Sequence, residues 1–277
     1  MQTIDPLAYQ NQKIHKILLG GVAPRPIALA STIDKNDQVN LSPFSFYNAF
    51  GVNPTTLVFS PSRRGRDNTT KHTLENILEV QEVVINAVSY DMIQQMSLSS
   101  TEYPKGVNEF VKSGFTPAKS IKIKPPRVKE SPLQFECKVR EVIETGGKAG
   151  SANLVVCEIV MIHIKDGLMD QVGNIDPDKI DLVGRLGGDY YVRASGDAKF
   201  IVQKPLAEKG IGVDSLPDFV RLSKYLSGNE LGLLGNLKKM PSKDDIEVYK
   251  AQIGPGISTL AEKDILKKAK KLINEGN

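Results

Sequence analysis

The chain has 277 residues, of which 40% are hydrophobic and 25% are charged, and its net charge at neutral pH is +4. This composition is that of an ordinary globular protein, and the length allows one large domain or two smaller ones. The mild net charge gives no support for a nucleic-acid-binding protein, and no apolar run is long enough to span a bilayer. The first ten residues, MQTIDPLAYQ, lack the layout of a signal peptide, so we expect a cytoplasmic protein.

The cysteines and histidines do not form a metal-binding pattern. Cys137 and Cys157 are far from any CxxC spacing, so we expect two unpaired, buried thiols. The histidines, His15, His72 and His163, are scattered and could not form a zinc site without carboxylate or thiolate ligands. The sequence therefore predicts no metal.

Strands dominate the elements predicted for the first hundred residues. In chain order these elements are a short helix over 9–18, strands over 27–33, 40–50 and 55–60, a helix over 73–80, a strand over 83–88 and a helix over 90–98. The first strand ends in the turn sequence Asp34-Lys35-Asn36-Asp37, and residues 51–54 form a bend between the second and third strands.

The middle of the chain predicts two long strands after a loop-rich region. Residues 99–131 contain four prolines, and the long strands cover 133–145 and 153–164. The glycine cluster over 146–151 lacks the order of a phosphate-binding loop, so a hairpin connection is favoured. No G-x-G-x-x-G follows a strand, which argues against a Rossmann fold. The whole pattern favours a mainly β protein with peripheral helices and a closed or partly closed barrel.

The character of the sequence changes at about residue 200. We divide the chain into a domain over 1–200 and a mostly helical C-terminal extension over 201–277, with helices over 222–226, 230–237 and 264–273. Thr259 and Glu262 have the spacing of a capping box for the last helix. This helix is basic and amphipathic, so contact with a membrane or nucleic acid is an alternative, but packing on the barrel is favoured.

The stretch over 40–73 carries the candidate site. It passes from an aromatic segment through a second apolar segment into a loop with Arg63, Arg64, Arg66 and Lys71, and then into a helix. A helix N-terminus presents free backbone N–H groups to anions, and guanidinium groups match phosphate oxygens. This order suits a flat ring system attached to a phosphate.

Five motifs occur in order along the chain: PRPIAL over 24–29, NLSPFSFYNAF over 40–50, SPSR over 60–63, KHT over 71–73 and GRLGGDYY over 184–191. Together they resemble the flavin reductase-like family, whose members fold as the FMN-binding split barrel. The resemblance covers roughly the first two-thirds of the chain. It implies a split β-barrel, FMN bound non-covalently, and a homodimer with the flavin near the interface. The helical C-terminal extension lies beyond the minimal family domain, so the expected fold is an FMN-binding split β-barrel with this extension added.

The resemblance also implies which residues bind the flavin. The phosphate would lie against the loop after the third strand, and the isoalloxazine ring would lie along residues 45–49, whose backbone N–H groups can bond its O4 and N5 edge. The expected FMN-binding residues are Ser45, Phe46, Tyr47, Asn48, Ala49, Ser60, Ser62, Arg63, Arg66, Asp67, Lys71 and Thr73.

Further candidates lie outside these two segments. His163 is the candidate catalytic residue, because it could meet a nicotinamide or a substrate, although a structural histidine explains the sequence equally well. Arg25, between two prolines, is a candidate for the positive charge near flavin N1. Relatives tend to carry an acidic residue where this chain has His72, and a histidine cannot orient the neighbouring cations as an anion. Tyr190 and Tyr191 could reach the flavin edge or the partner subunit.

The expected function is that of an FMN-dependent oxidoreductase of the flavin reductase type. An NAD(P)H:flavin oxidoreductase takes hydride from NADH or NADPH and passes electrons to free flavin, oxygen or another acceptor, and a monooxygenase partner fits this activity. The alternative is an FMN-binding redox carrier or sensor without turnover. A third interpretation keeps the barrel but gives it haem or pyridoxal phosphate, and nucleic-acid binding through the arginine loop is the least favoured.

Overall fold

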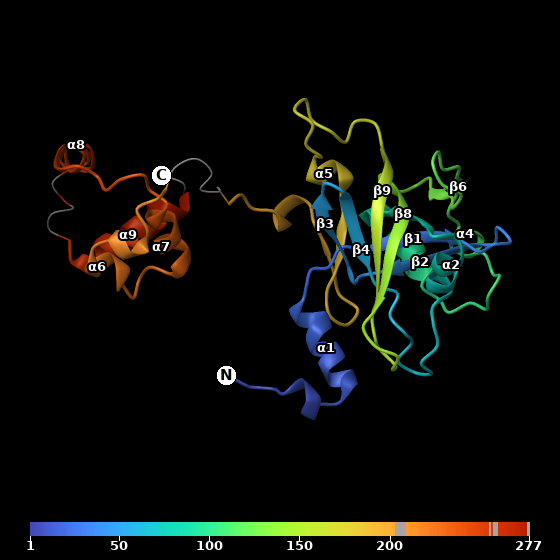
Figure 1. Cartoon of the computed structure of the whole chain (residues 1–277). Helices are drawn as coiled ribbons and strands as arrows, with labels where there is room; N and C mark the ends of the chain where they lie inside the picture. Colours follow the sequence, from blue (N-terminus) through green and yellow to red (C-terminus); the bar gives the residue numbers. More distant parts are fainter. Residues whose placement is uncertain (203–208, 255, 257–259, 276–277) are drawn as a thin grey trace. The chain divides into compact units, whose positions relative to one another are not determined.

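A computed structural model describes residues 1–202, 209–254, 256 and 260–275 of the chain. The chain divides into two compact units, residues 1–200 and residues 201–277. Figure 1 shows that strands occur in the first unit and that the second consists of helices and connections.

One antiparallel sheet organises the first unit. Its order is β2-β1-β5-β8-β9-β4-β3, and every neighbouring pair in it is antiparallel. The seven strands are β1 (Ala28–Ile33), β2 (Val39–Phe44), β3 (Tyr47–Val52), β4 (Thr55–Phe59), β5 (Glu82–Asn86), β8 (Leu133–Glu144) and β9 (Asn153–Ile164).

The order of the strands forces the sheet to curl. β2 and β3 are its two edge strands, yet only Ser45 and Phe46 separate them in the sequence. In a flat sheet, six strand spacings would hold these edges about 29 Å apart, whereas the three Cα–Cα steps across the link span at most about 11 Å. Bulges in the β8–β9 pair, one between Glu136 and Cys137, add to the bending. The result is a barrel whose two edges meet at Ser45–Phe46 without pairing along their length.

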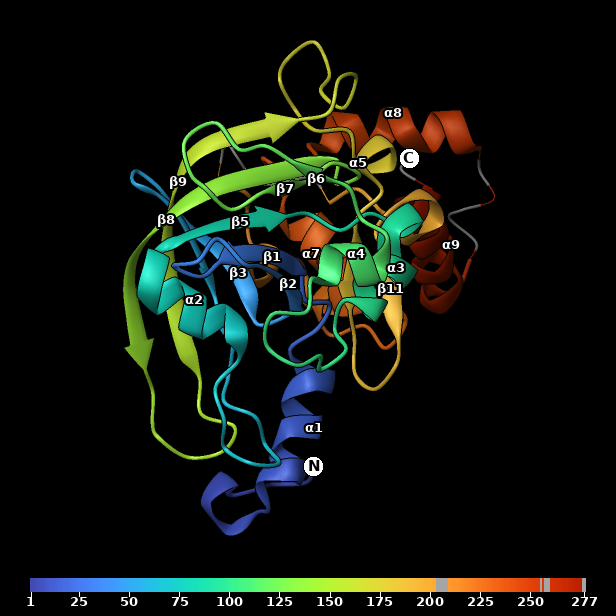
Figure 2. The ribbon, with the colours of Figure 1, turned by 90° about the vertical axis from the view of Figure 1, so that its right-hand side faces the viewer.

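The core of the barrel contains the apolar side chains that alternate along these strands. Phe44 and Phe59 pack with their ring centroids 5.5 Å apart. Helix α2 (His72–Val80) packs against β1 and β2 (Figure 2), and its Ile77 is fully buried. Cys137 and Cys157 are free and buried in the same core, so the prediction of two unpaired thiols is confirmed.

A second apolar cluster lies under the short elements that follow α2. It includes Met92, Met96 and Phe110, each at most 2% exposed, and they pack with Leu29 and Leu41 of the sheet. The remaining elements of this unit are η1 (Pro6–Ala8), α1 (Asn11–Gly21), η2 (Tyr90–Met92), α3 (Ile93–Leu98), α4 (Glu109–Ser113), the pair β6 (Pro117–Ala118) and β7 (Arg127–Val128), α5 (Pro177–Ile180), the pair β10 (Val183–Arg185) and β11 (Tyr191–Arg193), and η3 (Gly196–Ala198).

Most of the predicted strands are present, and one prediction is wrong. The segment over 40–50 was expected as one strand, but it forms the end of β2, a link at Ser45–Phe46, and β3. Both halves are apolar enough to be strands, and the break places them on opposite edges of the curled sheet. The glycine cluster over 146–151 lies in the β8–β9 connection, so the hairpin interpretation is confirmed.

The second unit contains η4 (Val213–Ser215), α6 (Asp218–Arg221), α7 (Gly228–Gly235), α8 (Lys243–Ile253) and α9 (Glu262–Glu275). Glu230 accepts hydrogen bonds from the backbone and hydroxyl of Ser227, and it lies 3.6 Å from Lys270 of α9. The helix predicted over 222–226 is wrong, because α6 ends at Arg221, and α8 was not predicted. The predicted cap residue Thr259 lies outside the described residues. Packing of α9 on the barrel stays a prediction.

No helix in the described part of the chain combines the length and apolarity needed to cross a membrane.

Candidate functional site

A cleft of about 360 Å³ lies where the two edges of the barrel meet. Three segments form it: the end of β2 with the following link, the loop after β4, and the chain that follows α3. Its lining residues are Ser42, Pro43, Phe44, Ser45, Phe46, Ser60, Ser62, Arg63, Arg64, Gly65, Arg66, Lys71, Ser100 and Glu102. The fold therefore brings the start of the predicted ring segment, Ser45 and Phe46, and most of the predicted phosphate segment into one cavity.

The loop after β4, which we call the cationic loop (residues 61–71), is held by its own polar groups. Arg63 donates from Nε to the side-chain oxygen of Asn68 and from Nη2 to its carbonyl, at 2.9 and 2.8 Å. Asp67 Oδ1 accepts from the backbone N–H and the hydroxyl of Thr69, at 3.0 and 2.7 Å. Asn68 has a φ of 60°, which an asparagine tolerates in such a turn. These bonds fix the backbone that carries the cations.

The β8–β9 connection supports the cationic loop from outside. The backbone N–H of Arg63 donates to the carbonyl of Ser151, and the side-chain amide of Asn68 donates to the carbonyl of Gly147. Asn153, at the start of β9, donates from its side chain to the carbonyl of Pro61 at 2.9 Å. The glycine cluster thus positions the loop, and its residues do not line the cleft.

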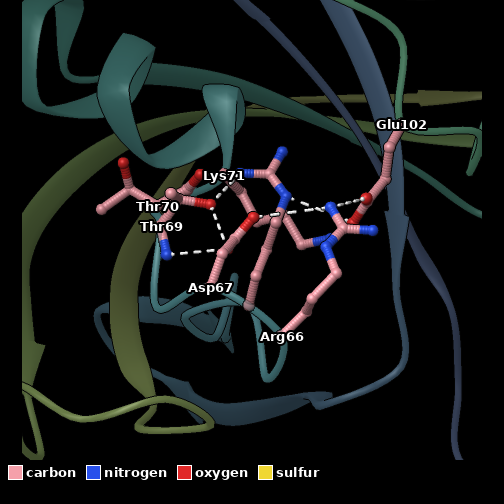
Figure 3. A network of polar contacts seen from close by, with 7 residues as sticks. Arg66, Asp67, Thr69, Thr70, Lys71 and Glu102 are labelled. Atoms are coloured by element: carbon pink, nitrogen blue, oxygen red, sulfur yellow. Dashed lines mark hydrogen bonds and ion pairs between the residues drawn. The ribbon is translucent and has the colours of Figure 1, made fainter.

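Four cations line the cleft, and three of them point at one carboxylate. Glu102 Oε1 lies 3.2 Å from Arg64 Nε and 3.4 Å from Lys71 Nζ, and Oε2 lies 2.9 Å from Arg66 Nη2. Figure 3 shows the side chains of Arg66 and Glu102 meeting, with Lys71 beside them. The hydrogen bond from Arg66 lowers the pKa of Glu102 despite partial desolvation, so this carboxylate is ionised at neutral pH.

Hydroxyl groups line the cleft beside these cations. Ser60 and Ser62 lie with their hydroxyl oxygens 3.2 Å apart, and Ser60 is 5% exposed and accepts from the backbone N–H of Asn153. Ser45 accepts from Nε of Arg25 at 3.4 Å, which leaves its own hydroxyl proton available to a ligand. The cleft therefore offers both cationic and neutral donors.

Arg25 acts at the edge of the site through Ser45. Arg25 as a whole is 4% exposed, and its guanidinium also donates to the carbonyls of Leu19, Val22 and Leu186. Burial, and then the neighbouring Arg185, lower the pKa of Arg25. These contacts join the end of α1 to the segment after β10, and they turn the guanidinium toward backbone carbonyls.

Five predicted flavin-binding residues do not line the cleft. Tyr47 packs against the barrel core, where burial raises the pKa of its hydroxyl, and Asn48 accepts from the backbone N–H of Ala49. Asp67 faces Thr69 within the loop. Thr73 is 1% exposed and accepts from the side chain of Asn40 at 2.9 Å. Tyr47, Asn48 and Ala49 lie on β3, next to the cleft residue Phe46, while Thr73 lines a smaller neighbouring cavity.

His163 lies apart from the cleft. It is near the end of β9, ten residues beyond Asn153, which corresponds to roughly 30 Å along a strand. Its Nε2 lies 2.7 Å from Oε1 of Glu136, and Glu136 is fully buried and also accepts from the backbone N–H groups of Ile121 and Lys122. The structure does not bring His163 together with the predicted FMN-binding residues of the same chain.

The sequence predictions missed the contribution of residues 100 and 102. Glu102 follows α3 in a segment without helix or strand, 31 residues after Lys71 in the chain. No sequence pattern around Glu102 predicts its contact with Lys71. Glu102 does supply what His72 cannot, which is a carboxylate beside the cations. Burial lowers the pKa of His72, and this residue lines two smaller cavities beside the cleft.

Comparisons with known proteins agree with this geometry. Residues 20–177 match the family described as "Flavin reductase like domain". A relative from Aquifex aeolicus, an uncharacterised protein, is 39% identical over 189 residues, which cover 68% of this chain and 94% of that protein.

Two solved structures extend the comparison. Nitrilotriacetate monooxygenase component B from Bacillus cereus is 25% identical with a TM-score of 0.68, covering 73% of this chain and 98% of that one. A flavin reductase with a split barrel domain from Shewanella frigidimarina is 27% identical with a TM-score of 0.61, covering 71% of this chain and 96% of that one. The barrel that curls between β2 and β3 is thus the split barrel predicted from the sequence. The chain belongs to the flavin reductase-like family, a family of flavin-related oxidoreductases.

Proposed function

We propose that this protein is an FMN-dependent NAD(P)H:flavin oxidoreductase, which accepts hydride from NADH or NADPH and passes electrons to an acceptor. The observation that carries this proposal is the cleft in which the Ser45–Phe46 link faces the cationic loop. Its volume of about 360 Å³ lies within the usual range for small-molecule sites. A single group of cations at one end suits the single terminal phosphate of FMN.

In this proposal the cationic loop binds the phosphate. Arg66 and Lys71 supply charged donors, and the hydroxyl groups of Ser60 and Ser62 supply neutral ones. Arg63 acts mainly by holding the loop through Asn68, because two of its guanidinium nitrogens donate to that residue. The preformed loop lowers the entropic cost of binding the anion.

The barrel edge orients the ring in the same proposal. Ser45 can donate its hydroxyl proton to a ring acceptor while Arg25 holds its oxygen. We retain Tyr47, Asn48 and Ala49 as proposed ring contacts, because β3 is an edge strand with one side unpaired within the described sheet. FMN itself would supply the redox chemistry. No acid or base from the chain is required, since alignment of two flat rings provides much of the rate, and His163 is therefore given no role.

We also propose that the protein is a homodimer. Phe50 and Val52 of β3 are 69% and 89% exposed, which is unusual for apolar residues on an edge strand. The similarity to component B of a two-component monooxygenase supports a monooxygenase as a partner for the reduced flavin. The two free, buried thiols fit a reducing compartment such as the cytoplasm.

Anaerobic mixing tests the proposed activity. The purified protein is loaded with FMN and mixed with NADH or NADPH, and the absorbance of the oxidised flavin is followed. We expect this absorbance to disappear within seconds and to return on admission of oxygen. If dithionite bleaches the flavin and neither nicotinamide does, the protein is instead an FMN-binding redox carrier or sensor. A Soret band in the absorption spectrum of the protein as isolated would show that the barrel binds haem instead of flavin.

A further inference from the structure

The carboxylate of Glu102 occupies the middle of the cationic group that lines the cleft. Its two oxygens contact Arg64, Arg66 and Lys71 at 2.9–3.4 Å (Figure 3). The fourth cation of the lining, Arg63, donates to Asn68. Arg64 also donates from Nη1 to Thr69 and Thr70. Arg66 and Lys71, the two cations that bind the phosphate in the proposed function, both contact Glu102.

A carboxylate in this position presents the same chemistry as a phosphate group. Both are anions whose oxygens accept from guanidinium and ammonium donors. A phosphate monoester carries a larger charge, about −1.5 to −2 at neutral pH, and three acceptor oxygens. Two such anions on the same donors would repel each other strongly at a separation of a few ångströms. Glu102 and a phosphate therefore compete for the cations.

The surroundings of Glu102 allow it to leave. It lies in the connection between α3 and α4, outside helix and strand, and its side chain is 42% exposed. A change in its side-chain torsions would transfer the carboxylate to water without moving a regular element. The backbone that carries Arg64 and Arg66 is more constrained, because Asp67, Asn68 and Thr69 hold the loop. The side chain of Arg64 is held as well, by its hydrogen bonds to Thr69 and Thr70, whereas the side chain of Arg66 is 74% exposed.

We propose that Glu102 is an internal competitor of the flavin phosphate, which lowers the affinity of the cleft for FMN and speeds its release. This inference rests on the proposed function, because it concerns the same site. Its consequence is that the protein holds FMN as an exchangeable ligand, suited to delivering reduced flavin to a partner.

The test compares FMN and riboflavin binding to the full-length protein and to Glu102→Gln. The substitution removes the charge and keeps the shape of the side chain. We expect the Kd for FMN to fall about threefold to fivefold, the upper part of the range expected for a partly exposed ion pair, and its dissociation rate to fall accordingly. The Kd for riboflavin, which has no phosphate, should stay within about twofold of the wild-type value.

Two further variants control the experiment. Glu141→Gln removes an exposed carboxylate from β8, outside the cleft, and should leave the FMN affinity unchanged. Glu102→Asp keeps the charge but shortens the reach, and should give an intermediate affinity. Weaker FMN binding by Glu102→Gln would show that Glu102 positions the cations for the ligand and would overturn the inference. An unchanged FMN affinity would overturn it as well.

The binding of inorganic phosphate to the wild type and to Glu102→Gln distinguishes a failure of this inference from a failure of the proposed function. This binding is measured by the concentration dependence of the melting temperature of each protein. If neither protein binds FMN, the proposed function fails, yet tighter phosphate binding by Glu102→Gln would still support competition. If phosphate binds both proteins equally, the competition fails whatever the flavin does.

Discussion

Replacement of Lys71 by alanine should weaken the binding of FMN and leave the binding of riboflavin unchanged. Lys71 precedes α2, lines the cleft, and places its ammonium 3.4 Å from Oε1 of Glu102. In our account this ammonium binds the phosphate of FMN. Riboflavin has the same ring and no phosphate, so it should bind Lys71→Ala and the wild type alike.

The size of the effect follows from the exposure of the side chain. A hydrogen bond to a charged group contributes about 1.5–3 kcal/mol when it is shielded from water. The side chain of Lys71 is 32% exposed, so we expect a contribution at or just below the lower end of this range, about 1–2 kcal/mol, after screening by solvent. This corresponds to a loss of about fivefold to thirtyfold in FMN affinity.

Quenching of flavin fluorescence on binding gives both dissociation constants. Lys105→Ala is the matched control, because Lys105 pairs with Glu75 at 3.2 Å and does not line the cleft. It removes the same charge and should leave FMN affinity within about twofold. Equal losses for FMN and riboflavin in Lys71→Ala, or no loss for FMN, would refute the assignment of the phosphate to this loop.

Three further predictions follow, two from buried titratable groups and one from a close backbone approach. Desolvation disfavours the charged form of Glu136, but backbone donors and His163 outweigh it and lower the pKa of this carboxyl group. Its ionised form therefore stabilises the fold fully above the ordinary glutamate pKa of about 4.3. This contribution is lost as the pH falls through the lower pKa of the folded protein. Urea unfolding should show a larger deficit for Glu136→Gln at pH 6 than at pH 3, and a pH-independent deficit would contradict this. Cys137 and Cys157 are buried, and desolvation is the main cause of their raised pKa values. A thiol reagent should therefore label neither cysteine until the protein is denatured. Rapid labelling at neutral pH would contradict their burial. A β-carbon on Gly210 would lie 2.5 Å from the carbonyl oxygen of Gly235. The substitution Gly210→Ala should therefore destabilise the C-terminal unit by about 1–3 kcal/mol and speed its proteolysis. An unchanged rate of proteolysis would contradict the close approach.

The strands were predictable from the sequence because their apolar residues are local signals. β1, β4, β5, β8 and β9 each lie within a residue or two of the predicted ranges. The break at Ser45–Phe46 was not predictable in this way, because the residues on both sides favour strands. It is imposed by the closure of the sheet, which depends on all seven strands.

The cationic loop was predictable for the same local reason, and its partner carboxylate was not. Arg66 and Lys71 occur next to the hydroxyl residues and the helix start, so one stretch of sequence contains them. Glu102 joins them only through the folding of α3 against the barrel edge, and sequence spacing does not report such a contact. His163 shows the opposite case, because a residue type with catalytic potential lies far from the cleft and pairs with the buried Glu136.

Two helices of the second unit, α6 and α8, were not predicted from the sequence. α8 is polar along most of its length, and its exposed face gives little apolar periodicity. Its start is marked by Ser242, which exchanges hydrogen bonds with Asp245, and this capping box was the available signal.

A crystal structure of the protein with FMN tests the central claim most directly. The measurement is the distance from the phosphate oxygens of FMN to Lys71 Nζ and Arg66 Nη2. Our account predicts hydrogen-bonding distances of about 2.7–3.2 Å, with the ring beside Ser45 and Phe46 and Glu102 turned away from the cations. FMN bound elsewhere on the barrel, or bound here with its phosphate away from the cationic loop, would contradict the account.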